Sequence, residues 1–381
     1  MTFYGGGFIQ GSAYFTIPPS AYPILNVSSD SNIVFIYPNY RVNAFGLLAG
    51  KEVDADPHSD TNAGLLDQRA VIAWANKYAA QFGGDPDDVS IWGQSAGAGS
   101  VVAQVIADQD YAPGTLGSGA RFSKALASSP FWDKTYNATA PEAQWNYDTL
   151  VNRTGCAGAD DTLACLKGAD VQAIRDASLF IAGSHQYNTS SFTWAPVVDG
   201  KFIPQPLSLA AAQGRVNGEQ AFGMYNTHEG ENFIPGLSNS TFDAWLTGFL
   251  PGLSKCELDA VRRNYPEAGT SETIPSYNST TIRAGLIFRD VVLACPAYWM
   301  AGAAPRGSWL GEYSISPAKH ASDTYWASSR PLFEYDVRLH SLLTVFGSGI
   351  KSTQLSIRIP STMKDTQAHL PRSLSRATRT S

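Results

Sequence analysis

The hydrophobic pattern in the first third of the chain alternates between strand-like runs and helix-like stripes. Residues 32–37 form a nearly continuous apolar run bounded by turn formers, which is typical of a strand buried on both faces of a parallel sheet. Residues 65–82 carry apolar side chains at helical spacing, and a Gly-Gly-Asp-Pro turn at 83–86 ends that helix. A short strand is predicted at 89–92 and a helix at 96–107. Strands that alternate with helices predict an α/β fold with a mostly parallel central sheet flanked by helices.

The remainder of the chain is less regular. We expect helices near 161–179, 240–248, 256–265 and 282–301, and strands at 220–225 and 309–315. From about Asp336 the sequence is rich in Ser, Thr and Arg, has few acidic residues and shows no sustained period. We therefore expect residues 1–335 to form one domain and residues 336–381 to be a poorly ordered tail outside the fold.

Composition narrows the classes of function. The 381 residues are 44% hydrophobic and 16% charged, enough to bury a large core, and the formal net charge of -6 argues against a nucleic-acid partner. No stretch reaches the roughly 18 apolar residues of a membrane helix. The nearest, 291–304, is interrupted by Pro296, so no stable membrane insertion is expected. Neither a basic start nor a long apolar run follows Met1, so no signal peptide is predicted in this chain.

Other features indicate the secretory route. Six Asn-x-Ser/Thr sequons occur, at Asn26, Asn137, Asn152, Asn188, Asn239 and Asn278. The 4 cysteines allow three pairings. Cys156 and Cys165 lie close enough in sequence to close a small surface loop, which would leave Cys256 and Cys295 as the second pair; the alternative is that some of the four are free buried thiols. Sequons and an even cysteine count together favour a secreted protein.

Ser95 is the strongest candidate for chemistry. It lies in Gly-Gln-Ser-Ala-Gly at 93–97, directly after a predicted strand and before a predicted helix. A serine on such a turn is exposed to a base, and the small residues Gly93 and Gly97 leave room for neighbouring backbone. The pattern alone is weak, but its place between strand and helix favours a nucleophile over a structural turn.

A glycine triplet, Gly5-Gly6-Gly7, is the second candidate element. Consecutive glycines let N–H groups turn toward one point, and hydrolysis of an ester passes through an oxyanion that such donors stabilise. A flexible loop is the alternative. Because the triplet precedes the serine motif in the same chain, Gly6, Gly7 and Ala96 are predicted to donate to an oxyanion.

The base is expected to follow the acid, because this type of fold orders its triad serine, acid, histidine. Of the 6 histidines, His320 lies on a loop after a predicted strand. His58 and His185 come too early, His228 precedes the candidate acid, and His340 and His369 lie in the atypical tail. A solvated loop histidine is the alternative for His320.

Glu229 is the preferred acid, because it directly follows the strand predicted at 220–225. Asp323 is too close in sequence to His320 to be its natural partner, although it could support the site from behind. Asp199 is the other rival, and its Asp-Gly setting is typical of a turn.

These residues together resemble the type-B carboxylesterase and lipase family, which includes cholinesterases and secreted fungal lipases. The resemblance runs from Tyr4 to about Trp326. It rests on Gly5-Gly6-Gly7-Phe8 with Gly11-Ser12, Asn39-Tyr40-Arg41, residues 62–69, residues 82–86, Gly93-Gln94-Ser95-Ala96-Gly97-Ala98, residues 196–200, Glu229-Gly230 and residues 320–323. It implies an α/β-hydrolase fold, with Ser95 as nucleophile, Glu229 as acid, His320 as base and Gly6, Gly7 and Ala96 as oxyanion donors. The Cys156–Cys165 loop is similar to a short disulfide loop of fungal members.

Three departures from the family pattern stand out. Family members begin well upstream of the glycine triplet, so we expect Met1 to be internal or a wrong start, and the fold to lack its N-terminal strands. Gln94 stands where the family often has Glu, which removes a charge near the site. The tail after about Ser328 resembles nothing in the family, and a misread gene model is the simplest explanation.

The sequence therefore predicts a carboxylic-ester hydrolase that works through an acyl-enzyme, uses no cofactor or metal, and acts on a small-molecule or lipid ester. Secretion is expected for the full-length protein. The alternatives are an inactive truncated family member and a binding or adhesion homologue on the same fold. The ester itself, lipase against esterase preference, and the oligomeric state are not fixed by these residues.

Overall fold

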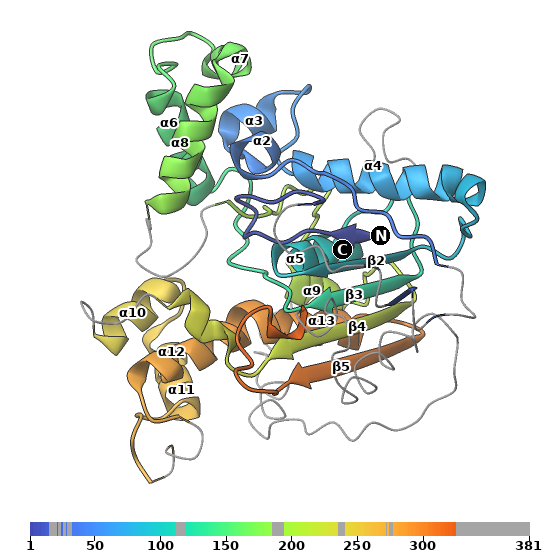
Figure 1. Ribbon diagram of the computed structural model, residues 1–381. Coiled ribbons are helices and arrows are strands. Elements are labelled where there is room, and N and C mark those ends of the chain that lie inside the picture. Colours follow the sequence, from blue (N-terminus) through green and yellow to red (C-terminus); the bar gives the residue numbers. More distant parts are fainter. Residues whose placement is uncertain are drawn as a thin grey trace, which may run out of the picture.

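The central element of the computed structural model is a five-stranded, fully parallel sheet in the order β1-β2-β3-β4-β5. The structure describes residues 1–14, 21, 24–25, 28, 33–111, 119–184, 194–234, 241–271, 273 and 277–324. The strands are β1 (Thr2–Phe3), β2 (Ser90–Gln94), β3 (Lys124–Ser128), β4 (Gln220–Asn226) and β5 (Gly307–Tyr313). The strands lie in one twisted layer with their carboxyl ends at a common edge (Figure 1).

One face of this sheet is covered by α5 (Ala96–Ile106) and α13 (Cys295–Ala303); α9 (Leu207–Ala212) packs against both helices, and α4 (Ala63–Tyr78) packs against α5. All residues of α5 are buried, as its run of small and apolar side chains predicts. A 3₁₀ turn, Ala79–Phe82, continues α4 to Gly83, whose φ of 81° ends the helix. This layer and the sheet enclose the largest hydrophobic core.

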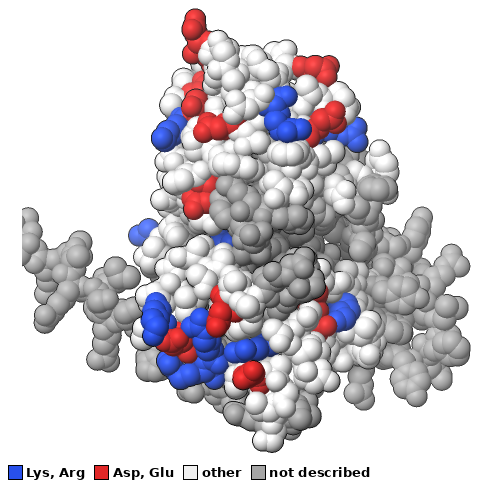
Figure 2. Space-filling view, turned by 90° about the vertical axis from the view of Figure 1, so that its left-hand side faces the viewer, with Lys and Arg blue, Asp and Glu red and all other residues white. Residues whose placement is uncertain are grey.

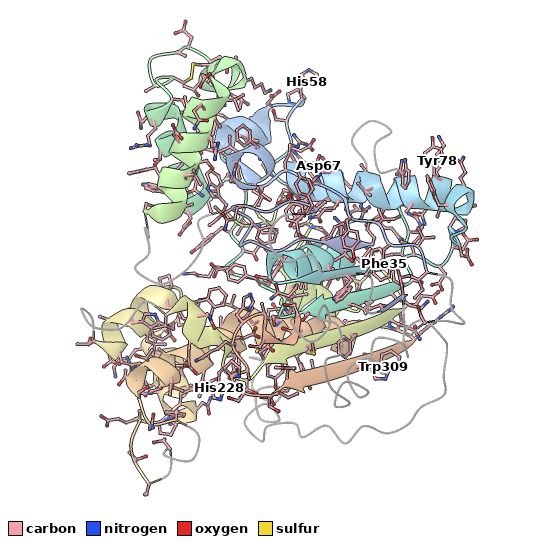
Figure 3. All side chains as sticks on the ribbon, viewed as in Figure 1. Phe35, His58, Asp67, Tyr78, His228 and Trp309 are labelled. Carbon is pink, nitrogen blue, oxygen red and sulfur yellow. A yellow bond between two sulfur atoms is a disulfide. The ribbon has the colours of Figure 1, made fainter. Side chains whose placement is uncertain are left out.

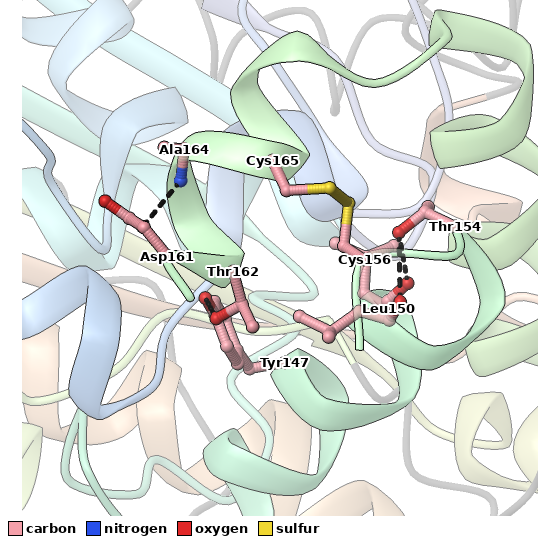
Figure 4. The surroundings of a disulfide bond; sticks show 9 residues. Tyr147, Leu150, Thr154, Cys156, Asp161, Thr162, Ala164 and Cys165 are labelled. Atoms are coloured by element: carbon pink, nitrogen blue, oxygen red, sulfur yellow. Dashed lines mark hydrogen bonds between the residues drawn. A yellow bond between two sulfur atoms is a disulfide. The ribbon is translucent and has the colours of Figure 1, made fainter. Parts of the chain in front are cut away.

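A separate lobe stands beyond the sheet edge (Figure 1). It contains α6 (Pro141–Arg153), α7 (Thr162–Gly168) and α8 (Val171–Gly183), next to α2 (Asn43–Leu47) and α3 (Lys51–Ala55). Its side chains form a second core around buried Tyr147 and Trp194. The Cys156–Cys165 disulfide joins the end of α6 to α7 (Figure 4).

A second lobe is made by α10 (Phe242–Phe249), α11 (Lys255–Asn264) and α12 (Thr280–Arg289). Acidic and basic side chains are interspersed on the outer face of both lobes (Figure 2). On α11, Arg262 pairs with Asp243 and with Asp259. On the outer face of the two lobes, the described surface therefore carries charges of both signs close together, and not a large patch of one sign.

The helix predicted at 282–301 is confirmed: α12 and α13 belong to one continuous helix that runs through Pro296. A π-helical turn, Asp290–Ala294, joins the two parts. Proline cannot donate to the carbonyl four residues before it, and that carbonyl, of Val292, instead accepts the N–H of Trp132 at 3.0 Å. The expectation that Pro296 interrupts the apolar stretch is therefore wrong. Residues 280–303 are long and apolar enough to cross a membrane by composition alone, but 61% of the most apolar window is buried inside the fold, as in the core helix of a globular protein.

Several predicted elements are confirmed with small shifts of their ends: α4, β2, α5, β4, α10, α11, β5 and the helix formed by α12, the π turn and α13. The patch predicted at 161–179 is two helices, α7 and α8. Residues 33–37 form no assigned strand, so the strand predicted at 32–37 is not found in them; the backbone bond from Thr2 N–H to the Ile36 carbonyl, at 2.9 Å, joins them to β1. The tail predicted at 336–381 and Asn32 lie outside the described residues.

Candidate active site

Ser95 occupies a strained turn between β2 and α5. Its φ of 59° and ψ of -127° are rare for a residue with a side chain. A Cβ on Gly97 would lie 2.2 Å from the Phe3 carbonyl oxygen, and one on Gly93 would lie 2.2 Å from the Gly97 carbonyl carbon. Both glycines are therefore required by close backbone approach, as the sequence pattern predicts.

The backbone of Ser95 is held on both sides. Its N–H donates to the Ser128 carbonyl at 3.0 Å, at the end of β3. Its carbonyl accepts the N–H of Gly99 at 2.9 Å and that of Phe131 at 3.0 Å. These bonds fix the position from which the hydroxyl projects.

His320 lies on the loop that follows β5 and contacts Ser95 directly. Its Nε2 is 2.8 Å from Ser95 Oγ, and its Nδ1 is 2.8 Å from Glu229 Oε2. The backbone N–H of His320 donates to Asn232 Oδ1 at 3.1 Å, and the Phe233 ring packs edge-on against the imidazole with centroids 4.9 Å apart. The imidazole is therefore held from several directions.

Glu229 begins a 3₁₀ turn, Glu229–Phe233, directly after β4, and it is fully buried. Its Oε1 accepts the backbone N–H of Asn226 at 2.9 Å, and its Oε2 accepts the Asn226 side-chain amide at 3.3 Å. An ionised carboxylate only accepts hydrogen bonds, so the proton of a neutral His320 lies on Nδ1 and its Nε2 is free to accept from Ser95. The structure thus brings together the three residues that the sequence singled out.

The glycine loop packs on the serine. A Cβ on Gly5 would lie 3.1 Å from Ser95 Cβ. Gly6 and Gly7 have φ values of 116° and 63°, which favour glycine. Within the described parts of the chain, the N–H groups of Gly6, Gly7 and Ala96 donate no hydrogen bond, so all three are available to a ligand.

Gln94 is buried and contacts His320. Its Nε2 lies 3.3 Å from His320 Nε2, on the same nitrogen that faces Ser95. The sequence indicated only that a charge is missing at this position. The structure adds that a neutral amide lies against His320.

The other candidates do not reach the serine. Asp199 bonds to the Asn62 side chain at 2.8 Å and to the N–H of Ile203, so this rival acid holds a turn. His228 lies beside the site and pairs with Glu231 at 3.2 Å, and His58 is exposed near α3 (Figure 3). His185, His340 and His369 lie outside the described residues.

Asp323 is fully buried behind the acid. Its carboxyl is bonded to the Ser128 hydroxyl and, at 2.9 Å, to the Asn226 amide. Burial raises the pKa of Asp323, opposed by these two hydrogen bonds, and the charge of Glu229 adds to the rise. Sequence reasoning missed Asn226 and Ser128, because a single Asn or Ser near a strand end carries no pattern that marks it.

The cysteine prediction is half correct. Cys156 and Cys165 form a disulfide, whereas Cys256 and Cys295 are free thiols, so the second predicted pair is wrong. Cys256 faces solvent in the first turn of α11, while Cys295 lies within the long core helix, where burial raises the pKa of its thiol to about 12. A disulfide requires both sulfurs at one place, and these two positions do not provide that.

The described sequon asparagines are all exposed: Asn137, Asn152 and Asn278. Asn26, Asn188 and Asn239 lie outside the described residues. Among the residues that the structure describes, no group of three His, Cys, Asp or Glu side chains is placed to hold a metal ion.

A parallel sheet with a serine between strand and helix, a histidine after the last strand and a buried acid after the strand before it defines the α/β-hydrolase class. Solved structures agree: Aspergillus niger EstA matches with a TM-score of 0.72 and 26% identity, over 91% of this chain and 70% of that one. A second structure, PNB esterase, has a TM-score of 0.71 at 21% identity and supports the fold.

The family model described as the Carboxylesterase family matches residues 1–365, and the chain belongs to that family. A secreted triacylglycerol lipase of Gibberella zeae is 33% identical over 273 residues, 69% of this chain and 45% of that protein. Carboxylesterase patB of Aspergillus clavatus is 28% identical, covering 84% of this chain and 55% of that protein. The chain spans about half the length of the curated relatives it matches.

Proposed function

We propose that the protein hydrolyses carboxylic esters, with Ser95 as nucleophile, His320 as base and Glu229 as the acid that orients it. The observation that carries this is the unbroken series of hydrogen bonds from Ser95 Oγ through His320 to Glu229, each 2.8 Å long. A serine hydroxyl is a weak nucleophile until a base accepts its proton, and this geometry supplies the base within reach.

In the first half-reaction, Ser95 Oγ attacks the ester carbonyl carbon while its proton moves to His320 Nε2. The imidazolium forms next to buried Glu229, which stabilises it. His320 then gives the proton to the alcohol oxygen as the carbon–oxygen bond breaks, and the acyl group stays on Ser95. Water, deprotonated by the same Nε2, releases the carboxylic acid and restores the serine.

The carbonyl oxygen becomes an oxyanion in both half-reactions. We assign its stabilisation to the N–H groups of Gly6, Gly7 and Ala96, which have no acceptor within the described residues. Each such donor can lower the barrier by roughly 3 kcal/mol. The positive φ of both glycines supports a loop built to point its amides away from regular structure.

The substrate is proposed to be a small-molecule or lipid ester, since relatives are named lipases and carboxylesterases. We also propose that the full-length protein is secreted. Exposed sequon asparagines, the Cys156–Cys165 disulfide and relatives named as secreted lipases support that location. Expression in a eukaryotic host, followed by glycosidase treatment and mass measurement, tests it.

The decisive experiment compares Ser95→Ala with Ser254→Ala. Ser254 caps α11, and its hydroxyl bonds to Glu257 within the same turn. We expect Ser95→Ala to lower hydrolysis of p-nitrophenyl esters by about 10³-fold or more and to abolish fluorophosphonate labelling. Ser254→Ala should keep both. Labelling of Ser95→Ala at the wild-type level would defeat the proposal and favour a binding role.

A further inference from the structure

A second buried carboxyl, Asp323, lies behind Glu229 and has no role in the reaction as described above. Its side chain is 2% exposed. Oδ1 accepts the Asn226 amide at 2.9 Å, and Oδ2 is bonded to the Ser128 hydroxyl. In the part of the chain that the structure describes, none of its hydrogen-bond partners is a Lys or Arg.

Asn226 connects the two acids. Its Nδ2 is 2.9 Å from Asp323 Oδ1 and 3.3 Å from Glu229 Oε2, and its backbone N–H is 2.9 Å from Glu229 Oε1. The Ser129 hydroxyl lies a further 2.9 Å from the same Nδ2. The NH₂ group has two hydrogens for these three acceptors, so its longer contact with Glu229 Oε2 shares a hydrogen with one of the shorter bonds to Asp323 and Ser129. Asn226 thus contacts both oxygens of Glu229, while Asp323 and Ser129 fix the position of its amide.

The charges around Asp323 determine whether its carboxyl group is protonated or ionised. The groups that face it are Ser128 from β3, Asn226 from β4, Glu229 from the 3₁₀ turn, and the imidazole of His320. His320 is the one base among these groups, and its Nδ1 is already hydrogen-bonded to Glu229. Two ionised carboxyls buried around one amide repel each other, and without a cation beside it the second is the one that stays protonated.

We propose that Asp323 is a positioning residue that acts as a neutral carboxylic acid, holding the Asn226 amide against Glu229 so that a single negative charge faces His320. An ionised Asp323 accepts from the Ser128 hydroxyl; in the neutral form this bond reverses, so that the Asp323 O–H donates to Ser128 Oγ, while the carbonyl oxygen still accepts from Asn226. This proposal rests on the proposed function, because the residue acts through the Glu229–His320 pair.

Asparagine has nearly the same shape as a neutral aspartic acid, so it can replace Asp323 in these hydrogen bonds. In Asp323→Asn the carbonyl can still accept from Asn226 and the NH₂ can donate to Ser128. In Asp323→Ala the Asn226 amide loses one of its two shortest bonds and keeps the other, to Ser129, so it can turn away from Glu229. The two variants therefore separate the role of the hydrogen bonds from the role of a charge.

The test measures ester hydrolysis against pH for the full chain and both variants. We expect Asp323→Asn to keep kcat within about threefold and to leave the acid limb of the kcat/KM profile in place. Asp323→Ala should lower kcat by about tenfold to a hundredfold with KM little changed. If Asp323 were ionised, Asp323→Asn would remove a negative charge near His320 and move the acid limb to lower pH; that shift would overturn the proposal.

A readout independent of activity completes the test. At pH 7 the infrared spectrum of the wild-type chain should contain the carbonyl band of a protonated carboxyl, and Asp323→Asn should lack it. No difference between the two spectra would overturn the proposal. A wild-type chain without esterase activity would defeat the proposed function, yet the band would still report on Asp323. The band and the Asn variant also remain decisive if Asp323→Ala does not fold.

Asp199 offers a matched control. Its carboxylate also accepts a buried amide, that of Asn62, at 2.8 Å, but it has no bond to the triad. Asp199→Ala should lower thermal stability and leave both kcat and the pH profile unchanged. An equal loss of kcat in the Asp199 and Asp323 alanine variants would reduce the role of Asp323 to general stability and overturn the proposal.

Discussion

At the scale of single residues, the orientation of Glu229 is set by a donor that cannot be exchanged. The backbone N–H of Asn226 points at Oε1 from 2.9 Å, and an N–H requires an acceptor. An oxygen is therefore favoured at the Oε1 position, because a backbone N–H cannot turn away, whereas the Asn226 side-chain amide that donates to Oε2 can. A substitution of Glu229 therefore changes the chemistry at the Oε2 position, which faces His320.

This constraint predicts the effect of Glu229→Gln. The amide oxygen will occupy the Oε1 position, so the NH₂ must face His320 Nδ1. Nδ1 then has to accept, which places the ring proton on Nε2, where it cannot take the proton of Ser95. We expect kcat to fall by about 10³–10⁴-fold with little change in KM, measured on a p-nitrophenyl ester. Glu229→Asp, which keeps the charge, should lose less; activity of the Gln variant within tenfold of wild type would contradict this orientation.

Residues that combine a reactive side chain with a recognisable place in the sequence pattern could be predicted from the sequence. Ser95, His320 and Glu229 each combine a reactive side chain with a place after a predicted strand, and the structure brings them within hydrogen-bond distance. Asn226 could not be found, because its importance comes from which groups surround its amide. The free state of Cys256 and Cys295 was missed for the same reason: counting thiols says nothing of where they lie.

At the scale of elements, the acid-bearing turn is pressed against α12. A Cβ on Gly230 would lie 1.8 Å from the Gly285 carbonyl oxygen, and one on Gly285 would lie 2.7 Å from Glu231 Cγ. Two facing glycines thus allow the turn to sit on the helix backbone. Glu229 takes its position from this contact as much as from its own hydrogen bonds.

Gly230→Ala should therefore damage stability and activity together. The added methyl has to push the turn away from α12, at a cost of about 1–3 kcal/mol, and the displacement moves Glu229 from His320. Scanning calorimetry and kcat measure the two effects. Gly302→Ala is the control, since its Cβ meets nothing within 4 Å and the helix α13 gains a better helix former. A Gly230→Ala variant as stable and active as Gly302→Ala would refute the close contact.

Long elements with a clear period were predictable, and short ones were not. Helix α4 and strand β4 follow their apolar pattern closely. Strand β3, Lys124–Ser128, has small side chains and one large apolar residue, so no pattern marked it. Residues 33–37 show the opposite error: their composition favours a strand, but strand assignment requires a paired neighbour, and β1 is only two residues long.

At the scale of the whole molecule, most core residues of the described chain fall into two clusters, and a third is small. The sheet and its helices enclose the larger one, while α6, α7 and α8 enclose a second around Tyr147 and Trp194. The triad lies at the sheet, and the Cys156–Cys165 disulfide lies in the lobe. Loss of the disulfide should therefore affect the lobe first.

We expect Cys156→Ser combined with Cys165→Ser to destabilise the lobe by about 2–3 kcal/mol, the chain-entropy value for a loop this short. Hydrogen exchange should rise in α6–α8 while the strands stay protected, and kcat should change by less than about threefold. Cys256→Ser, which removes an exposed free thiol, should alter neither. Equal loss of protection in the sheet would show that lobe and sheet unfold as one unit.

The hydrogen bond that Pro296 cannot make has a consequence for anyone who redesigns this protein. The Val292 carbonyl accepts from Trp132, and the neighbouring Phe131 N–H holds the Ser95 carbonyl. Replacement of the proline to regularise the helix would add an N–H that competes with Trp132 for that carbonyl, and we expect it to loosen the loop that holds Ser95. A more regular helix would then weaken the support of the proposed nucleophile.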